Sequence, residues 1–172
     1  MPESVDLAAQ VAAETADILF VFRIAPTMAC EFMSPAVAQH TGWTAEECIA
    51  DPTLIARLVH PDDLHILQAA DDVPVGEHYD FEVRWQHRDG RTVWMQERLR
   101  KQIRDDGAVV LYGSARDITA FKDAEKSLAE TEELYRLIAE NSLEVVYRAP
   151  SNMAITWVSP SVREVLGWSV EE

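Results

Sequence analysis

The sequence is poor in basic side chains and has no long apolar run. Its 15 lysines and arginines are outnumbered by 30 aspartates and glutamates, which gives a formal net charge of −15. Nucleic acids and anionic membranes are bound through clustered Lys and Arg, so neither is expected as a partner. No apolar stretch approaches the roughly 20 residues of a membrane span. No basic region followed by an apolar one opens the sequence, so no secretory signal is expected.

Cysteine is also rare, and the motifs of common enzyme classes are missing. Cys30 and Cys48 stand apart without a Cys-x-x-Cys spacing, which favours two buried or half-buried thiols in a reducing, cytoplasmic environment. The sequence has no phosphate-binding glycine loop, no G-x-S-x-G motif and no Gly-Gly-acid-Glu-Phe motif. No spacing of Ser, His and Asp, or of Cys and His, places a nucleophile beside a base. We therefore expect no enzyme activity.

The strongest organisational signal is an internal repeat. Residues 21–47 align without a gap with residues 146–172, at an offset of 125 positions, and 11 of the 27 pairs are identical. A repeat at this period indicates a unit of about 100 residues, followed by a linker and the opening of a second unit. The second copy is too short to bury a core of its own, because domains below about 40 residues rarely do so.

The pattern of apolar residues predicts an α+β fold. Two apolar runs come first, then short helical patterns, and then segments in which apolar and polar residues alternate as in half-buried strands. Asp-Gly pairs mark hairpin turns between the later strands. We expect helices set against one face of a five-stranded antiparallel sheet. The expected strands cover residues 17–24, 29–33, 79–85, 91–104 and 109–118.

The first helices of this unit carry recognisable start and stop signals. Ser34-Pro35 predicts an N-cap serine with proline at the first helical position, and Gly42 ends that helix. The segment Thr44–Glu47 has the spacing of a capping box, which starts the next helix. A further short helix is expected after Pro52.

A fourth helix is expected to open with proline at its first position, Pro61. Asp62 and Asp63 follow in its first turn, where they face the positive end of the helix dipole. These acids lie close to His60 and His65, a grouping that invites a metal-site interpretation. Because capping and dipole roles already explain the acids, no metal site is expected.

A long helix is expected over residues 121–140, which contain neither glycine nor proline. One of its faces repeats with the 3-4-3-4-3 spacing of a heptad seam. The seam spans fewer than three heptads and includes small residues, so it would pair weakly alone. We expect it to join two copies of the chain in a homodimer. The seam residues are Phe121, Ala124, Leu128, Thr131, Tyr135 and Ile138.

Six short motifs occur in a characteristic order: Ser34-Pro35, Gly42–Glu47, His60–Asp63, His87–Gly90, Trp94 and Gly113–Thr119. Together they resemble the PAS domains of bacterial signal-transduction proteins. The resemblance covers about residues 17–120. Residues 142–172 are similar to the start of a second PAS domain. Each motif is weak alone, and their shared order and spacing carry the resemblance.

The resemblance implies a sheet of strand order 2-1-5-4-3 with a pocket between sheet and helices. It also implies a sensor and dimerisation module that signals through its C-terminal helix to a histidine kinase or diguanylate cyclase output domain. No output motif is present, and no histidine follows His87 to serve as a phosphoacceptor. The expected divisions are an amphipathic helix over 1–16, the sensor over 17–119, the connector over 120–141 and the truncated second domain over 142–172.

The expected pocket is rich in aromatic and aliphatic side chains, so a small apolar or aromatic ligand would suit it. The alternative is a filled core, which would leave a ligand-free dimerisation and spacer module. The sequence leaves open which of Phe81 and Glu82 faces the pocket. The candidate pocket residues are Phe20, Phe22, Phe32, Trp43, Leu58, Leu67, Phe81, Val83, Trp94 and Leu111.

A haem- or flavin-dependent redox or gas sensor is a further alternative. Haem-binding relatives ligate iron through a histidine on the helix before the third strand, and His65 lies there. Flavin photochemistry needs a cysteine in an Asn-Cys-Arg-Phe setting, and Cys48 lies near that region in a different setting. No cofactor is the leading expectation.

The last strand ends in Asp117, Ile118 and Thr119, which match the junction motif of the family. The resemblance implies that motion of the sheet reaches the exit helix here. Asp117 is expected to cap that helix or to pair with a basic group, with Arg91 or Arg98 as candidates. Capping and signal relay are hard to separate, because a cap is the physical coupling between sheet and helix.

Overall fold

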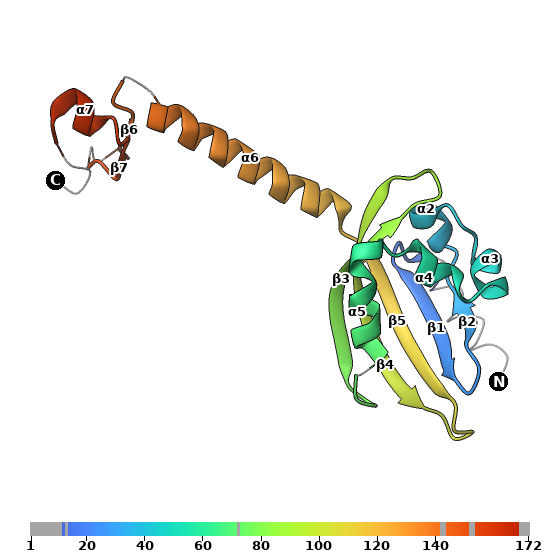
Figure 1. Ribbon diagram of the computed structural model, residues 1–172. Coiled ribbons are helices and arrows are strands. Elements are labelled where there is room, and N and C mark those ends of the chain that lie inside the picture. Colours follow the sequence, from blue (N-terminus) through green and yellow to red (C-terminus); the bar gives the residue numbers. More distant parts are fainter. Residues whose placement is uncertain (1–11, 13, 72, 142–143, 152–153, 169–172) are drawn as a thin grey trace. The chain divides into compact units, whose positions relative to one another are not determined.

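The computed structural model describes residues 12, 14–71, 73–141, 144–151 and 154–168 (Figure 1). It divides into two compact units, Met1–Ala120 and Phe121–Glu172. The N-terminal helix expected over residues 1–16 lies almost wholly outside the described residues. In the described part of the chain, no helix is long and apolar enough to cross a membrane.

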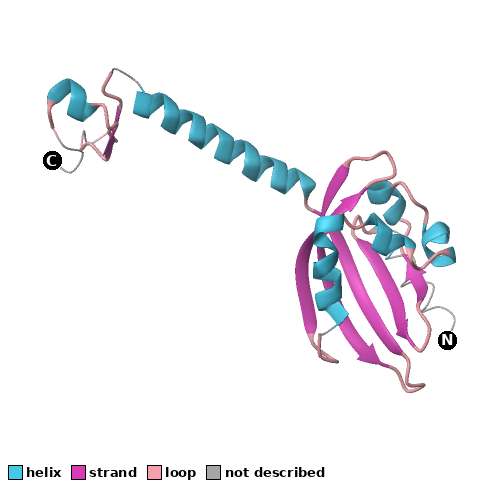
Figure 2. Ribbon diagram, in the orientation of Figure 1, coloured by secondary structure: helices cyan, strands magenta, loops and turns pink. Residues whose placement is uncertain are grey.

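The first unit is built on a five-stranded antiparallel sheet of order β2-β1-β5-β4-β3 (Figures 1 and 2). This order and the α+β class confirm the expected fold. The expected strand bounds agree with the observed ones to within a few residues. The strands are β1 (Ile18–Ala25), β2 (Ala29–Met33), β3 (His78–Gln86), β4 (Thr92–Ile103) and β5 (Val109–Asp117).

Short helices connect β2 to β3 and pack on one face of the sheet (Figure 2). The core lies between these helices and the inward-facing side chains of the strands. In β3 and β4 the pairs Val83–Met95 and Trp85–Val93 are fully or almost fully buried, as the period of two predicts. The helices are α2 (Val37–Thr41), α3 (Ala45–Ala50), α4 (Leu54–Leu58), the 3-10 turn η1 (Pro61–Asp63) and α5 (Leu64–Asp71).

Two of the expected helix signals are confirmed. Gly42 ends α2 in the left-handed conformation, with φ of 76°, and its N–H donates to the carbonyl of Ala38 at 2.9 Å. Thr44 and Glu47 form both hydrogen bonds of the capping box that starts α3. These signals are read correctly from sequence because each one is satisfied within a few residues of chain.

Ser34 was expected to cap α2, and this expectation is wrong. The N-cap is Ala36, and no side chain caps the helix. The buried Ser34 hydroxyl instead accepts a hydrogen bond from the Leu19 N–H at 2.9 Å, while the Ser34 N–H donates to the Leu19 carbonyl at 2.8 Å. Ser34 therefore extends the pairing of β1 with β2, a use that depends on a residue 15 positions away.

The place expected for Asp63, in the first turn after Pro61, is confirmed, but its pairing with Arg84 has no signal in the sequence. Asp63 is 7% exposed, and its carboxylate accepts hydrogen bonds from the backbone N–H, Nε and Nη2 of Arg84, at 2.8, 2.9 and 2.6 Å. These hydrogen bonds outweigh the opposing effect of burial and lower the pKa of Asp63 to about 2. The acid thus ties the start of α5 to β3 and does more than complement a helix dipole.

Gly113 on β5 has no side chain, and the Phe20 ring occupies the space that a Cβ at this position would need. A Cβ at residue 113 would clash with the Phe20 ring and lie 2.9 Å from Cδ2 of Leu99. We expect Gly113→Ala to lower the free energy of unfolding by roughly 1–3 kcal/mol through overpacking, measured by urea denaturation. Ser114→Ala on the other face of β5 is the control and should change it by less than about 0.5 kcal/mol. Equal stability of Gly113→Ala and the wild type would contradict this packing.

The second unit contains most of α6 (Thr119–Asn141), the hairpin of β6 (Tyr147–Arg148) and β7 (Trp157–Val158), and α7 (Val162–Leu166). Helix α7 corresponds residue by residue to α2 at the offset of 125. It ends at Gly167 with φ of 77°, as α2 ends at Gly42. The capping box expected over residues 169–172 lies outside the described residues.

Ser159 repeats the hydrogen-bonding role of Ser34. Its hydroxyl accepts from the Val146 N–H at 2.9 Å, and its N–H donates to the Val146 carbonyl at 2.7 Å. The second copy therefore has the same kind of strand pairing as the first, with a register that differs by two residues at this serine. Its identity as a second PAS domain stays a prediction.

Candidate functional site

A pocket of about 360 Å³ opens in the first unit between the sheet and the helices α4 and α5. Its volume lies within the range of small-molecule sites in proteins. The walls are almost entirely apolar and include three aromatic rings, those of Phe20, Phe22 and Trp85. Phe20 and Phe22 meet edge to face, with ring centroids 5.7 Å apart.

Among the described residues that line this pocket, Gln68 and Glu97 are the two with polar side chains. Glu97 is 4% exposed, and its Oε1 accepts a hydrogen bond from Nε1 of Trp85 at 3.0 Å. Burial raises the pKa of Glu97 to about 7, and the Trp85 hydrogen bond only partly opposes this rise. The pocket thus presents a carboxyl group that gives up its proton at a much higher pH than an exposed glutamate.

The structure brings four of the ten candidate pocket residues together in this pocket, namely Phe20, Phe22, Leu67 and Leu111. Leu58 and Val83 are buried in the core but do not line the pocket. Phe81 packs on the edge of the core against Tyr79, with ring centroids 5.0 Å apart. The structure therefore places these three in the packing around the pocket.

The remaining three candidates lie away from the pocket. Phe32 pairs with Val21 and Trp94 with Arg84, which puts both aromatic rings on the opposite sheet face. The guanidinium of Arg84 lies 5.6 Å from the Trp94 ring. Trp43 packs beside the core under the guanidinium of Arg88, 4.2 Å from its ring.

Several residues that line the pocket were not among the candidates from the sequence. Glu97 is the clearest case, because it falls on the inward-facing phase of β4 among Met95 and Leu99, where the alternation calls for an apolar residue. An acid out of phase with its strand pattern is the signal that would have found it. The open question over Phe81 and Glu82 is answered by register, since Phe81 packs on the core face.

The candidate cofactor residues lie outside the pocket. His65 is exposed on α5, and its Nδ1 lies 2.7 Å from the carbonyl oxygen of Asp62, so it is poorly placed to ligate a haem in this pocket. Cys30 and Cys48 are buried free thiols, and burial raises the pKa of each to about 11. Thiols with such pKa values stay protonated at neutral pH. Among the described residues, no cluster of His, Cys, Asp and Glu has a metal-binding arrangement.

The junction residues hold the start of α6 against the sheet. Thr119 accepts a hydrogen bond from the Trp94 N–H at its Oγ1, at 2.9 Å, and the Ile118 N–H donates to the Trp94 carbonyl at 2.8 Å. Oδ1 of Asp117 accepts from the Thr119 N–H at 2.8 Å. Strand β4 therefore continues its hydrogen bonding onto the first residue of α6.

The basic partner of Asp117 is His40, which the sequence did not single out. Nδ1 of His40 lies 3.2 Å from Oδ2 of Asp117, and its Nε2 lies 2.9 Å from the carbonyl oxygen of Ala16. Burial raises the pKa of Asp117, but hydrogen bonds from Thr119 and His40 bring it below its usual value. The other basic residue of this motif, Arg116, pairs instead with Asp17. A histidine on α2, 77 positions away, therefore completes the junction.

The expected dimer seam lies exposed along α6. Phe121, Leu128, Tyr135 and Ile138 are each more than half exposed, and Ala124 and Thr131 are exposed as well. Apolar side chains of this size are usually covered in a soluble protein. The seam is thus free to meet a partner, and a homodimer stays a prediction.

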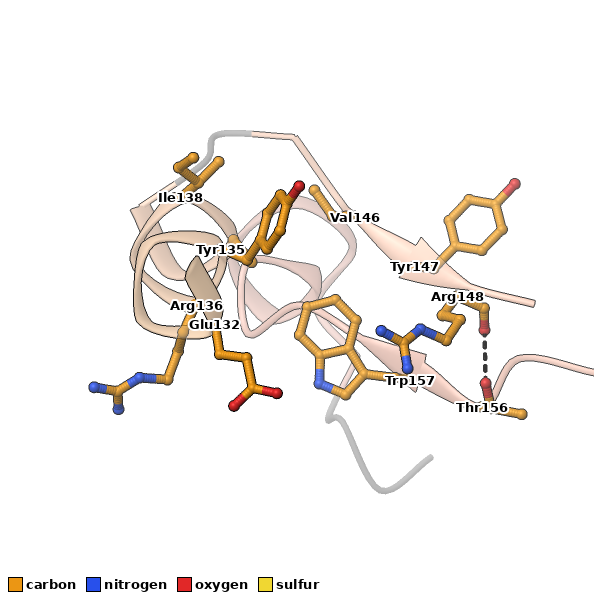
Figure 3. Close-up of a pocket in the computed structure, with 10 residues that line it drawn as sticks. Glu132, Tyr135, Arg136, Ile138, Val146, Tyr147, Arg148, Thr156 and Trp157 are labelled. Carbon is orange, nitrogen blue, oxygen red and sulfur yellow. Dashed lines mark hydrogen bonds between the residues drawn. The ribbon is translucent and has the colours of Figure 1, made fainter. Parts of the chain in front are cut away.

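A second hollow, of about 760 Å³, lies within the second unit (Figure 3). Tyr135 and Ile138 of α6 and Val146 and Trp157 of the hairpin gather around it. A hydrogen bond from Oγ1 of Thr156 to the Arg148 carbonyl, at 3.2 Å, joins the two sides of the hairpin to each other. Its aromatic walls are strongly exposed, which is typical of an incompletely covered core.

Comparisons with known proteins agree with this architecture. The family model described as the PAS fold matches residues 31–115. The structure of a sensory box histidine kinase/response regulator from Burkholderia thailandensis is 25% identical, with a TM-score of 0.56, over 77% of this chain and 97% of that chain. The N-terminal domain of a diguanylate cyclase with PAS/PAC sensor from Marinobacter aquaeolei is 24% identical, with a TM-score of 0.52, over 62% of this chain and 98% of that chain.

Two further matches are to longer proteins. An RNA-binding light-oxygen-voltage receptor has a TM-score of 0.59 at 19% identity and aligns with 75% of this chain and 37% of its own length. The uncharacterized protein y4lL of Sinorhizobium fredii is 27% identical over 137 residues, which is 78% of this chain and 16% of the relative. The chain thus spans a small part of these proteins. The sheet order, the match over residues 31–115 and the structural neighbours show that the first unit of this chain is a PAS domain, a sensory module of signal-transduction proteins.

Proposed function

We propose that this PAS domain is a non-catalytic sensor that binds a small ligand in the 360 Å³ pocket and relays its occupancy to α6. The relayed change acts on an output domain such as a histidine kinase or a diguanylate cyclase. Relatives described as a histidine kinase/response regulator and as a diguanylate cyclase with PAS/PAC sensor support this type of output.

The observation that carries the proposal is that one strand, β4, both lines the pocket and forms hydrogen bonds with the start of α6. Glu97 and Leu99 of β4 line the pocket, and Trp94 of the same strand holds Ile118 and Thr119 at the start of α6. A ligand that displaces β4 by a fraction of an ångström must also displace these hydrogen bonds. A ligand with different affinity for two positions of the strand therefore biases the position of the helix.

In the proposed homodimer, α6 is the element through which the change reaches the second copy of the chain. Its exposed seam suits a homodimer, and the ion pairs Lys126–Glu130 and Glu133–Arg136 add only weakly to its stability. A weakly paired helix needs only a few kcal/mol of bias to change register or angle. The second repeat after α6 is, on this proposal, the opening of another PAS domain.

The proposal is tested by following α6 while the pocket is emptied. Native mass spectrometry of the purified chain is expected to show a dimer with a bound small molecule, which unfolding, dialysis and refolding remove. Spin labels on Ala129→Cys should then report different inter-protomer distances in the loaded and the stripped protein. Cys30 and Cys48 are buried and leave this label site-specific.

Thr119→Val is expected to abolish most of this distance change, because it removes the acceptor of the Trp94 N–H and keeps the side-chain shape. Thr92→Val, the same substitution at the exposed start of β4, is the control and should leave the change intact. Two results together would contradict the sensor proposal: a mass that leaves no room for a bound molecule, and a distance distribution that is the same before and after the unfolding and refolding step. They would favour a ligand-free spacer.

A further inference from the structure

Glu97 is the carboxyl group of a mostly apolar chamber, and its one role in the packing, accepting the indole N–H of the buried Trp85, needs an acceptor but not a charge. The lining residues around it come from several elements and carry no charge, as Phe20 of β1, Met33 of β2, Ile55 of α4 and Leu67 of α5 show. Among the described residues, the bond from Trp85 is the only hydrogen bond that the Glu97 carboxyl makes. Buried carboxylates are normally paired with a cation or fully hydrogen-bonded.

We propose that the pocket takes an organic cation, a molecule with an apolar body and one protonated nitrogen that pairs with the Glu97 carboxylate. This inference rests on the proposed sensing function and names the chemical class of its ligand. No lysine, arginine or histidine lines the pocket in the part of the chain that the structure describes, so the protein supplies the negative partner and leaves the positive one to the ligand.

The walls of the pocket suit such a cation in two ways. The rings of Phe20, Phe22 and Trp85 offer π faces, which attract a nearby ammonium group. The apolar remainder of the walls covers the body of the ligand. The net charge of −15 also raises the local concentration of cations around the protein.

The usual objection to a buried ion pair is the cost of removing two charges from water. Above pH 7 Glu97 is mostly ionised in the folded domain, so the cost of burying its charge is already met in folding there. At such a pH a ligand cation loses only its own hydration and gains a carboxylate that has no competing positive partner among the described residues. The two thiols of the same core, Cys30 and Cys48, stay protonated and add no charge.

The test compares three probes of one shape and different charge: phenethylamine, 2-phenylethanol and phenylacetate. Binding is followed by the indole N–H resonance of Trp85, whose Nε1 donates to Glu97. At pH 8, phenethylamine is expected to bind at least tenfold more tightly than 2-phenylethanol, and phenylacetate most weakly. The amine stays protonated between pH 5.5 and 8, so its affinity should fall roughly 30-fold on lowering the pH to 5.5, as Glu97 is neutralised.

Glu97→Gln keeps the side-chain shape and should remove both the preference for the amine and its pH dependence. If this variant fails to fold, the pH dependence of amine binding to the wild type is sufficient to test the inference. Equal binding of the amine and the alcohol, or an amine affinity that stays constant with pH, would overturn the cation inference and leave the pocket as a ligand site. If the Trp85 resonance responds to none of the three probes, the proposal that this pocket binds a small ligand is contradicted as well.

Discussion

Asp63→Ala is expected to lower the free energy of unfolding by roughly 1.5–3 kcal/mol, because it removes the charged acceptor from an ion pair of which Asp63 is the buried and Arg84 the partly exposed partner. The substitution leaves the backbone N–H and the guanidinium of Arg84 without the carboxylate that accepts all three of their hydrogen bonds. It also releases the start of α5 from β3. Urea denaturation at pH 7 measures the effect.

Asp80→Ala is the matched control, because Asp80 also pairs with an arginine across the sheet, Arg98, but both partners are more than half exposed. Exposed ion pairs contribute little, so the control should cost less than about 1 kcal/mol. The lowered pKa of Asp63 adds a pH dependence, since its contribution is complete above pH 4 and is lost as the pH falls to about 2. Similar losses for both variants would show that burial does not set the strength of the Asp63–Arg84 pair.

Glu97→Gln is expected to stabilise the domain in alkaline solution, by about 3 kcal/mol at pH 8 and by about 1 kcal/mol at pH 5. The pKa of Glu97 rises from the usual 4.5 to about 7 on folding, so the folded state holds this proton more tightly than the unfolded state. Stability from this group is therefore lost as the pH rises from about 4.5 through 7. Glutamine carries no charge and can still accept from Trp85, so it removes the loss.

Urea denaturation of both proteins at pH 5 and pH 8 measures this difference. Glu77→Gln, which changes an exposed acid, should alter stability by less than about 0.5 kcal/mol at either pH. A stability gap between Glu97→Gln and the wild type that is the same at both pH values would mean that Glu97 does not titrate in this range.

The fold was predictable because its signals are local and repeated. The period of two from Tyr79 to Trp85, the capping box at Thr44 and the terminating Gly42 each act within a few residues of chain. The resemblance to PAS domains supplied the strand order, which periodicity alone does not give. The interactions that the sequence did not indicate involve long-range partners, since Ser34 forms hydrogen bonds with Leu19 of β1 and Asp63 pairs with Arg84 of β3.

The site was less predictable, for the same physical reason. The sequence places an aromatic residue on a strand but does not say which sheet face it joins, so Phe32 and Trp94 were included wrongly among the residues expected around the pocket. Glu97 was passed over because an acid is expected to face water. His40 was missed because its partner Asp117 lies 77 positions away, and only the folded sheet brings the two together.

Hydrogen bonds between Trp94 and the residues Ile118 and Thr119 attach the first residue of α6 to β4. Phe121, Leu128 and Tyr135 follow along α6 at intervals of seven residues, so their side chains lie on one side of the helix. Inserting one residue turns the distal part of the helix by about 100°, whereas inserting seven turns it by only about 20°. Chimeras that graft this sensor onto another effector should therefore be spliced in whole heptads.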